Sequence, residues 1–265
     1  NLKLNLTTNG SFALGGVKYW APRIVSVASD VKFSWNGSSK IIQEQIMKNS
    51  NFDKQLENLK YFIEVRDQFA RNGLNECTVT LQLTFMEQNL YDIPKVVELA
   101  IATGCDRVKG HHLWAHFDEI ADQTLRRSNE SIQRWNSVAN QCRTIAEENL
   151  LPNGKKIKLE NFYDLDLMKT HDPQERSVSF YNSIVDEAVC PFLGKEAWVN
   201  YEGRFDPCCA PNETRLSLGS FGNVTHAGTS MLDIWQSKEY NHLMENYLSN
   251  SLCRGCNMRR PPSKS

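Results

Sequence analysis

The segment CTVTLQLTF, residues 77–85, is the clearest strand in the sequence, because it alternates apolar and polar positions and is rich in β-branched residues. It is followed by DIPKVVELAIATG, residues 92–104, whose apolar pattern predicts a helix that starts near Pro94 and ends at Gly104. RVKGHHLW, residues 107–114, then predicts a second strand. A strand, a helix and a strand in this order are typical of a parallel sheet.

The same alternation extends along the chain on both sides of this unit. Further strands are predicted at residues 2–7, 31–37 and 156–162, and further helices at residues 52–72 and about 129–150. The predicted fold class is therefore α/β, with about five parallel strands in an open or partly closed barrel. Ligands of such sheets bind at the carboxyl ends of the strands. The side chains at these ends include Thr7, Thr8, Asn9, Ser34, Trp35, Asn36, Thr84, Asn89, His111, His112 and Trp114.

The composition argues against two classes of partner. Lys and Arg number 30 and Asp and Glu number 31, so a broad basic face for nucleic acid is not expected. No stretch approaches the roughly 18 apolar residues that cross a membrane, and the first residues lack the pattern of a signal peptide. The cysteine pattern favours a reducing compartment, and we expect a cytoplasmic protein.

The composition changes after residue 163, and this predicts four segments. They are a body at 1–163, a polar linker at 164–188, a cysteine-rich module at 189–258 and a disordered tail at 259–265. Within the module, WVNYEGRFDPC predicts a hairpin with its turn at Glu202 and Gly203. Residues 232–248 predict an amphipathic helix, so the module is expected to be a small α+β unit.

Four cysteines of the module have the spacing of metal ligands: Cys190, Cys208, Cys253 and Cys256. Four thiolates suit a tetrahedral zinc ion or a [4Fe–4S] cluster, and disulfides or free thiols are the alternatives. Structural zinc sites usually contain two close cysteine pairs, whereas this chain has one, which favours iron. Cys209 is expected to point away, because adjacent side chains on an extended segment face opposite sides. Cys77, Cys105 and Cys142 are interpreted as buried thiols.

The C-x12-G-x4-C pattern around Gly203, the following LGSFGNV and MLDIW segments and the final CRGC resemble the SPASM/twitch module. This module is the C-terminal extension of many radical S-adenosylmethionine (SAM) enzymes. Upstream, TTNG, FSWNG, TFMEQN and ATGCDRV resemble the later half of the partial, TIM-like radical SAM barrel. The resemblance covers nearly the whole chain; the C-terminal motif is fairly specific, and each barrel motif alone is weak.

The sequence departs from the family pattern in two places. The C-x3-C-x2-C loop, which binds the SAM-cleaving cluster, and the glycine-rich segment that meets the SAM amino group are absent from these residues. We therefore expect that the N-terminal part of the enzyme is missing and that this chain alone is inactive. The module also lacks the middle cysteines of the full seven-cysteine pattern. It resembles the shorter form with one auxiliary cluster, which the four cysteines would saturate.

The resemblance implies an oxidoreductase that uses SAM, a second [4Fe–4S] cluster and an external electron donor such as flavodoxin or ferredoxin. A 5′-deoxyadenosyl radical would abstract hydrogen from a peptide or a sugar-like small molecule, and the auxiliary cluster would relay an electron. By position, Ser34 and Asn36 are candidates to contact the SAM ribose or carboxylate, and Thr84 and Asn89 to flank the adenosine. Ordinary turn chemistry could also explain these four residues. No catalytic residue is assigned.

Two other functions fit the same cysteines. One is a non-enzymatic zinc-binding interaction module, and the other is a radical SAM paralogue that has lost SAM cleavage. The histidines at 111, 112 and 116 are weak evidence for a catalytic or metal site. His111 and His112 face opposite sides of a strand, so at most one of them can point into a cavity.

Overall fold

The computed structural model describes residues 3–12, 14–113, 115, 118–167, 189–210, 215–254, 256 and 259. The chain divides into two compact units, Asn1–His171 and Asp172–Ser265, and each is described by itself. Most of the predicted linker, from residue 168 onward, lies outside the described residues. The same holds for the predicted tail from residue 260 onward.

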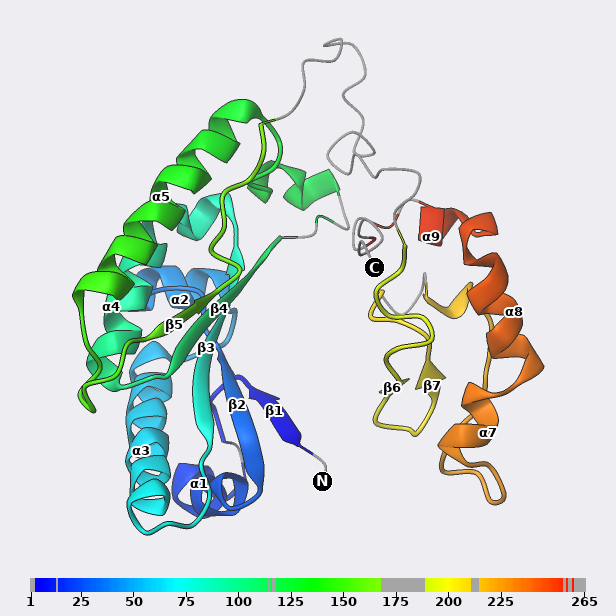
Figure 1. Ribbon diagram of the computed structural model, residues 1–265, viewed down its shortest axis with the longest axis horizontal. Coiled ribbons are helices and arrows are strands. Elements are labelled where there is room, and N and C mark those ends of the chain that lie inside the picture. The colour runs from blue at the N-terminus through cyan, green and yellow to red at the C-terminus, as the bar shows by residue number, and fades with distance from the viewer. Residues whose placement is uncertain are drawn as a thin grey trace. The chain divides into compact units, whose positions relative to one another are not determined.

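The first unit contains a parallel five-stranded sheet in the order β1-β2-β3-β4-β5. Its strands are β1 (Leu4–Thr8), β2 (Ala28–Ser34), β3 (Thr78–Phe85), β4 (Arg107–His112) and β5 (Lys158–Glu160). The connecting helices are α1 (Gly16–Val25), α2 (Lys40–Ile46), α3 (Phe52–Arg71), α4 (Ile93–Thr103) and α5 (Asn129–Glu148). Figure 1 shows α3, α4 and α5 along one face of this sheet. The predicted α/β class is confirmed, and the five strands do not close a barrel.

The alternation of each strand separates the two faces of the sheet. In β3, Leu81, Leu83 and Phe85 are buried on the face that the helices cover. They pack with Leu59 and Phe62 of α3 in the main core of the unit. Burying each large apolar side chain contributes about 1.5–3 kcal/mol, so this face supplies most of the stability of the sheet.

The opposite face of the sheet is polar, and we call it the polar face. A network of charged and hydroxyl side chains crosses it from β2 to β5: Asp30, Lys32, Thr80, Arg107, Lys109 and Glu160. Asp30 is 2.8 Å from both Lys32 and Arg107. Burial alone raises the pKa of Asp30, but hydrogen bonds from Lys32 and Thr80 and the charge of Arg107 outweigh it and lower the pKa. The network therefore keeps Asp30 ionised on this face.

Several boundaries differ from those the sequence predicts. β2 begins at Ala28 and ends at Ser34, because the chain turns away at residues 35–37. The helices α1 and α2 were not predicted; α1 contains Pro22, and α2 has only seven residues. Cys77, Cys105 and Cys142 are buried free thiols, as predicted. Among the described helices, none is both long and apolar enough to cross a membrane.

Gly110 of β4 lies directly beneath the ring of Phe85, and a Cβ atom there would lie 1.7 Å from the ring. We expect Gly110→Ala to destabilise the first unit by about 3 kcal/mol, because the overpacked core must shift. Urea unfolding measures this loss. Adding Phe85→Leu, which shortens the clashing side chain, should make the double variant more stable than the sum of the single effects predicts. Additive effects would contradict the steric explanation.

The second unit contains a two-stranded antiparallel hairpin and short helices. The strands are β6 (Trp198–Val199) and β7 (Phe205–Asp206), so the predicted hairpin is confirmed. The helices are α7 (Met231–Trp235), α8 (Lys238–Asn246), η4 (Tyr247–Ser249) and α9 (Ser251–Arg254). Its small core contains Phe205, Phe221, Ile234, Tyr240 and Leu243.

The prediction of one continuous helix at 232–248 is wrong. The helix breaks at Gln236 and Ser237, where the Ser237 side chain accepts a hydrogen bond from the Tyr240 N–H and starts α8 anew. The break allows Ile234 and Tyr240 to enter the same core.

Candidate functional site

The second unit brings the four predicted cysteine ligands together. Cys190 precedes β6 and Cys208 follows β7, while Cys253 lies in α9 and Cys256 follows it. Burial, together with the charges of Cys208, Cys190 and Cys256, raises the pKa of Cys253 to about 12. Groups that shift one another in this way lie within electrostatic range. Cys190, Cys208 and Cys256 therefore lie within electrostatic range of Cys253, and their role as ligands stays a prediction.

Backbone N–H groups point at two of these sulfurs. The N–H groups of Phe192 and Leu193 each donate to Cys190 Sγ at 3.5 Å. Burial raises the pKa of Cys208, and a hydrogen bond from the Ala210 backbone opposes this rise. Such donors favour thiolate over thiol and are among the features that tune iron–sulfur clusters. The donor set thus fits a cluster bound by thiolates.

Among the residues that the structure describes, no three His, Cys, Asp or Glu side chains are arranged to hold a single metal ion. Cys209, expected to point away, is the most exposed of the module's cysteines. Its pKa is raised by burial and then by the charges of Cys208 and Cys256, so its thiol still lies within electrostatic range of the site.

Two tyrosines hold the turn after Cys190 in place. The sequence analysis did not identify either of them as functional. The Cys190 N–H donates to Tyr247 Oη at 3.3 Å, and the Gly194 N–H donates to Tyr240 Oη at 3.0 Å. Tyr240 is fully buried in the core of the unit. Tyr240 follows the MLDIW segment in the sequence.

Gly203, the glycine of C-x12-G-x4-C, has a φ of +83°, and its backbone lies against the segment after β7. Its carbonyl accepts a hydrogen bond from the Val224 N–H at 2.8 Å. A Cβ atom would lie 2.4 Å from Thr225 Cγ2 and 2.7 Å from Asn223 Oδ1. The motif therefore requires glycine for two reasons, the left-handed conformation and the close approach.

We expect Gly203→Ala to destabilise the second unit by about 3 kcal/mol, because strain and overpacking add. Gly228→Ala is the matched control, since Gly228 has a φ of +81° and nothing within 4 Å of a Cβ atom. It should cost about 1 kcal/mol from strain alone. Urea unfolding combined with hydrogen exchange of residues 198–206 measures both, and equal losses would rule out the steric part.

At the carboxyl ends of the strands, Asn36 and Asn89 bind backbone. Asn36 Oδ1 accepts the Thr84 N–H at 2.8 Å. Asn89 Nδ2 donates to the carbonyls of Asn36 and Thr84, each at 3.0 Å, and its Oδ1 accepts the Met86 N–H. Asn89 is also almost fully buried. These two amides join the ends of β2 and β3. Asn89 uses both its oxygen and its nitrogen in this way, whereas Asn36 uses its Oδ1.

Buried glutamines extend these hydrogen bonds from the end of β2 to the end of β1. The sequence analysis did not identify them. Gln43 Oε1 accepts the N–H groups of Asn36 and Gly37 at 2.7 and 2.9 Å. Gln43 Nε2 donates to Gln55 Oε1, and Gln55 Nε2 donates to the Asn9 carbonyl at 2.6 Å. The available signal was Gln55 itself, a polar residue within the apolar stripe of α3.

Ser34 and Thr84 differ from the two asparagines. Both are half-buried on the polar face near the strand ends. Neither hydroxyl makes a hydrogen bond within the part of the chain that the structure describes. Of the four candidate SAM contacts, these two therefore have side chains available for a ligand.

The histidines separate as predicted. His111 is exposed on the polar face, whereas His112 lies on the helix-covered face against Phe85 and Trp135. Trp114 and His116 lie outside the described residues. His112 therefore cannot act as an acid or base at the strand ends.

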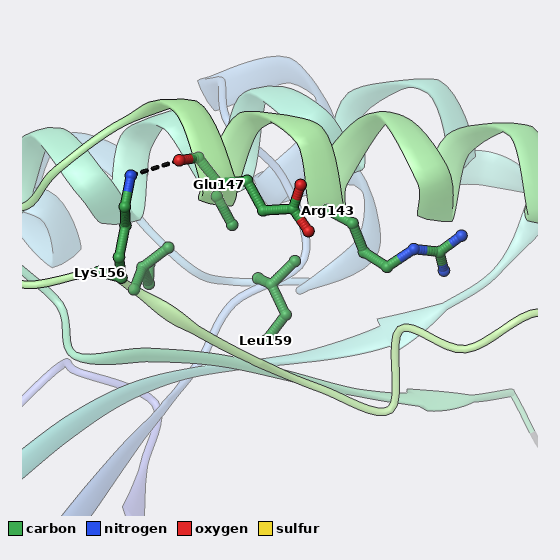
Figure 2. A pocket seen from close by; sticks show the side chains of 6 residues that line it. Arg143, Glu147, Lys156 and Leu159 are labelled. Carbon is green, nitrogen blue, oxygen red and sulfur yellow. Dashed lines mark hydrogen bonds between the residues drawn. The ribbon is translucent and has the colours of Figure 1, made fainter.

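A shallow pocket of about 290 Å³ lies between α5 and β5 (Figure 2). It is lined by Arg143, Ala146, Glu147, Lys156, Ile157 and Leu159. Lys156 Nζ donates to the carbonyls of Glu147 and Asn149, and Arg143 donates to the Phe162 carbonyl at 2.7 Å. Lys156 thus binds carbonyls at the C-terminal end of α5. None of the predicted ligand-binding residues lines this pocket.

Comparisons with known proteins agree with this architecture. Residues 190–257 match the SPASM family, described as an iron–sulfur cluster-binding domain. No curated protein matches the sequence. Among solved structures, SuiB of Streptococcus suis bound to precursor peptide SuiA has a TM-score of 0.55 at 16% identity, over 97% of this chain and 53% of that chain. Native anSMEcpe with bound AdoMet has a TM-score of 0.56 at 12% identity, over 97% of this chain and 65% of that chain.

The first unit has the α/β fold of these solved structures, with a parallel five-stranded sheet that does not close into a barrel. Residues 190–257 match the SPASM iron–sulfur cluster-binding domain. The chain spans about half of SuiB and under two thirds of anSMEcpe. The predicted iron–sulfur cofactor agrees with the matched family, and the second predicted cofactor, SAM, is bound in similar structures of both proteins.

Proposed function

We propose that this chain is part of a radical SAM oxidoreductase that modifies a peptide, with one auxiliary [4Fe–4S] cluster bound by Cys190, Cys208, Cys253 and Cys256. The observation that carries the proposal is that all four cysteines lie within residues 190–257, which match the SPASM iron–sulfur cluster-binding domain. The charge interactions of Cys253 with the other three thiols support it. A peptide is favoured over a sugar-like molecule because two of the similar proteins are described with bound peptides, SuiA and Cp18Cys.

In this proposal the first unit binds SAM and the second unit binds the auxiliary cluster. When bound, SAM and a reduced cluster supply a 5′-deoxyadenosyl radical that removes a hydrogen atom from the substrate. Ser34 and Thr84 offer hydroxyls to SAM at the strand ends, and Asn36 and Asn89 fix the backbone that carries them. Four cysteine ligands leave no iron open to substrate, which suits electron transfer with a donor such as flavodoxin or ferredoxin. A reducing, cytoplasmic setting would keep these thiolates competent.

Metal analysis tests the cluster. The chain is purified and reconstituted without oxygen, and its iron, sulfide and zinc are measured together with its visible absorption. We expect iron and sulfide in equal amounts and the broad visible absorption of iron–sulfur charge transfer. A colourless chain with one zinc ion and no iron would refute the proposal and support a zinc-binding interaction module.

The chemistry needs a separate test. The protein is expressed from its full gene, reduced, and given SAM with candidate peptides. Release of 5′-deoxyadenosine together with a mass change in a peptide supports the enzyme. A protein that carries its clusters but releases no 5′-deoxyadenosine, with or without peptides, would instead be a paralogue that has lost SAM cleavage.

A further inference from the structure

A buried carboxylate lies two residues before Cys208. Asp206, at the end of β7, is only 5% exposed. Its Oδ1 accepts a hydrogen bond from Arg204 Nε at 3.1 Å and forms an ion pair with Arg215 Nε, also at 3.1 Å. A buried carboxylate is costly unless cations accompany it, so the two arginines permit its burial.

Arg215 also makes a second contact, on the other side of Cys208. Its Nη1 donates to the Ala210 carbonyl at 2.9 Å, and Ala210 is 4% exposed. The Ala210 backbone in turn donates a hydrogen bond to the Cys208 thiol. One planar guanidinium therefore connects Asp206 to Ala210 and spans the short segment that carries Cys208.

The charge of Arg215 also acts on the sulfur. The Arg215 guanidinium contacts Asp206 on one side of Cys208 and Ala210 on the other, so its charge lies close to this sulfur. A guanidinium remains charged at every accessible pH. A fixed positive charge near an iron–sulfur cluster stabilises its more negative, reduced state, because net charge and hydrogen bonding set cluster potentials.

We infer that Arg215 is a positioning residue of the auxiliary cluster: its bridge from Asp206 to Ala210 fixes Cys208, and its charge raises the reduction potential of the cluster. The inference rests on the proposed function, because it requires that Cys208 binds the cluster. Arg215 belongs to none of the cysteine motifs, and neither the match to the SPASM family nor the similar structures assign it a role.

The test compares three variants of the reconstituted chain: Arg215→Gln, Arg215→Lys and Arg204→Gln. The readouts are the midpoint potential, from a redox titration followed by electron paramagnetic resonance, and the rate of iron loss to a chelator. Arg215→Gln should lower the potential and speed iron loss by about tenfold to a hundredfold, the range for residues that support metal ligands. Arg215→Lys keeps the charge without the planar fork, so the potential should stay near that of the wild type while iron loss accelerates.

Arg204→Gln is the matched control, because Arg204 pairs with the same carboxylate while Arg215 makes the bond to Ala210. It should change both readouts less than Arg215→Gln does. If Arg215→Gln does not fold, Arg215→Lys decides, and wild-type iron retention in it overturns the inference. Unchanged potential and iron retention in a folded Arg215→Gln overturn the inference alone. A wild-type chain that takes up zinc and no iron overturns the proposed function as well.

Discussion

Replacing Cys208 with serine should reduce the iron content of the reconstituted chain to below about a tenth of the wild-type value. A cluster with four cysteine ligands requires each of these thiolates for stable binding. Cys208 combines the features of a ligand. Its thiol interacts electrostatically with Cys190 and Cys253, and its segment is bound by Arg215. Iron and sulfide analysis after anaerobic reconstitution measures the loss, and the visible absorption should fall in parallel.

Cys209→Ser is the control that makes this result specific. Cys209 is the adjacent residue and is more exposed, and its thiol lies within range of Cys208 and Cys256. If Cys208 is the ligand, the Cys209 variant keeps its iron. Equal loss in both variants, or loss only in the Cys209 variant, would show that the ligand assignment at this step is wrong.

Losing the cluster should also weaken the fold of the second unit. Among its described residues, the core consists of five buried side chains, of which Tyr240 is one, and this is little for a unit of this size. Small units of this kind usually depend on metals or disulfides, and metal binding then contributes directly to folding. The Cys208→Ser chain should therefore show faster hydrogen exchange at residues 198–206 than the Cys209→Ser chain.

The strand and helix pattern of the first unit could be read from the sequence because burial on one face imposes a visible period. The segment 77–85 and the strand β3 agree to within one residue at the start. The helix α2 escaped prediction because its central Gln43 is buried for its hydrogen bonds, so the segment shows no clear apolar stripe. The break before α8 was not predicted, because the apolar pattern continues past it. The break is caused by Ser237, whose side chain caps the N-terminus of α8.

The strand ends show a further limit of sequence reasoning. Position in the pattern selects Ser34, Asn36, Thr84 and Asn89 equally. Only the hydrogen-bond partners separate them: Asn36 Oδ1 and both ends of the Asn89 amide bind backbone, while the two hydroxyls have no such bond within the described residues. Whether a polar side chain serves the fold or a ligand depends on contacts far apart in the chain, and no local pattern records them.

His112 occupies an environment that should make the first unit sensitive to acid. Its ring lies 4.7 Å from that of Trp135 and 5.4 Å from that of Phe85. Both ring nitrogens are buried, and neither has a hydrogen-bond partner among the residues that the structure describes. Burial, together with the charges of Arg126 and His111, lowers the pKa of His112 from 6.5 to about 3. The folded protein therefore keeps this imidazole neutral where an unfolded chain would protonate it.

Because the pKa is lower in the folded state, the unfolded chain binds the extra proton. The free energy of unfolding should be unaffected by this group above pH 6.5 and fall as the pH drops from 6.5 towards 3, by up to about 1.4 kcal/mol per pH unit. Urea unfolding at a series of pH values across this window measures the slope. His112→Leu fills a similar space without a titrating group and should lose this part of the slope, whereas His111→Gln, on the exposed polar face, should retain it. An equal slope in the wild type and His112→Leu would show that other groups cause the acid sensitivity.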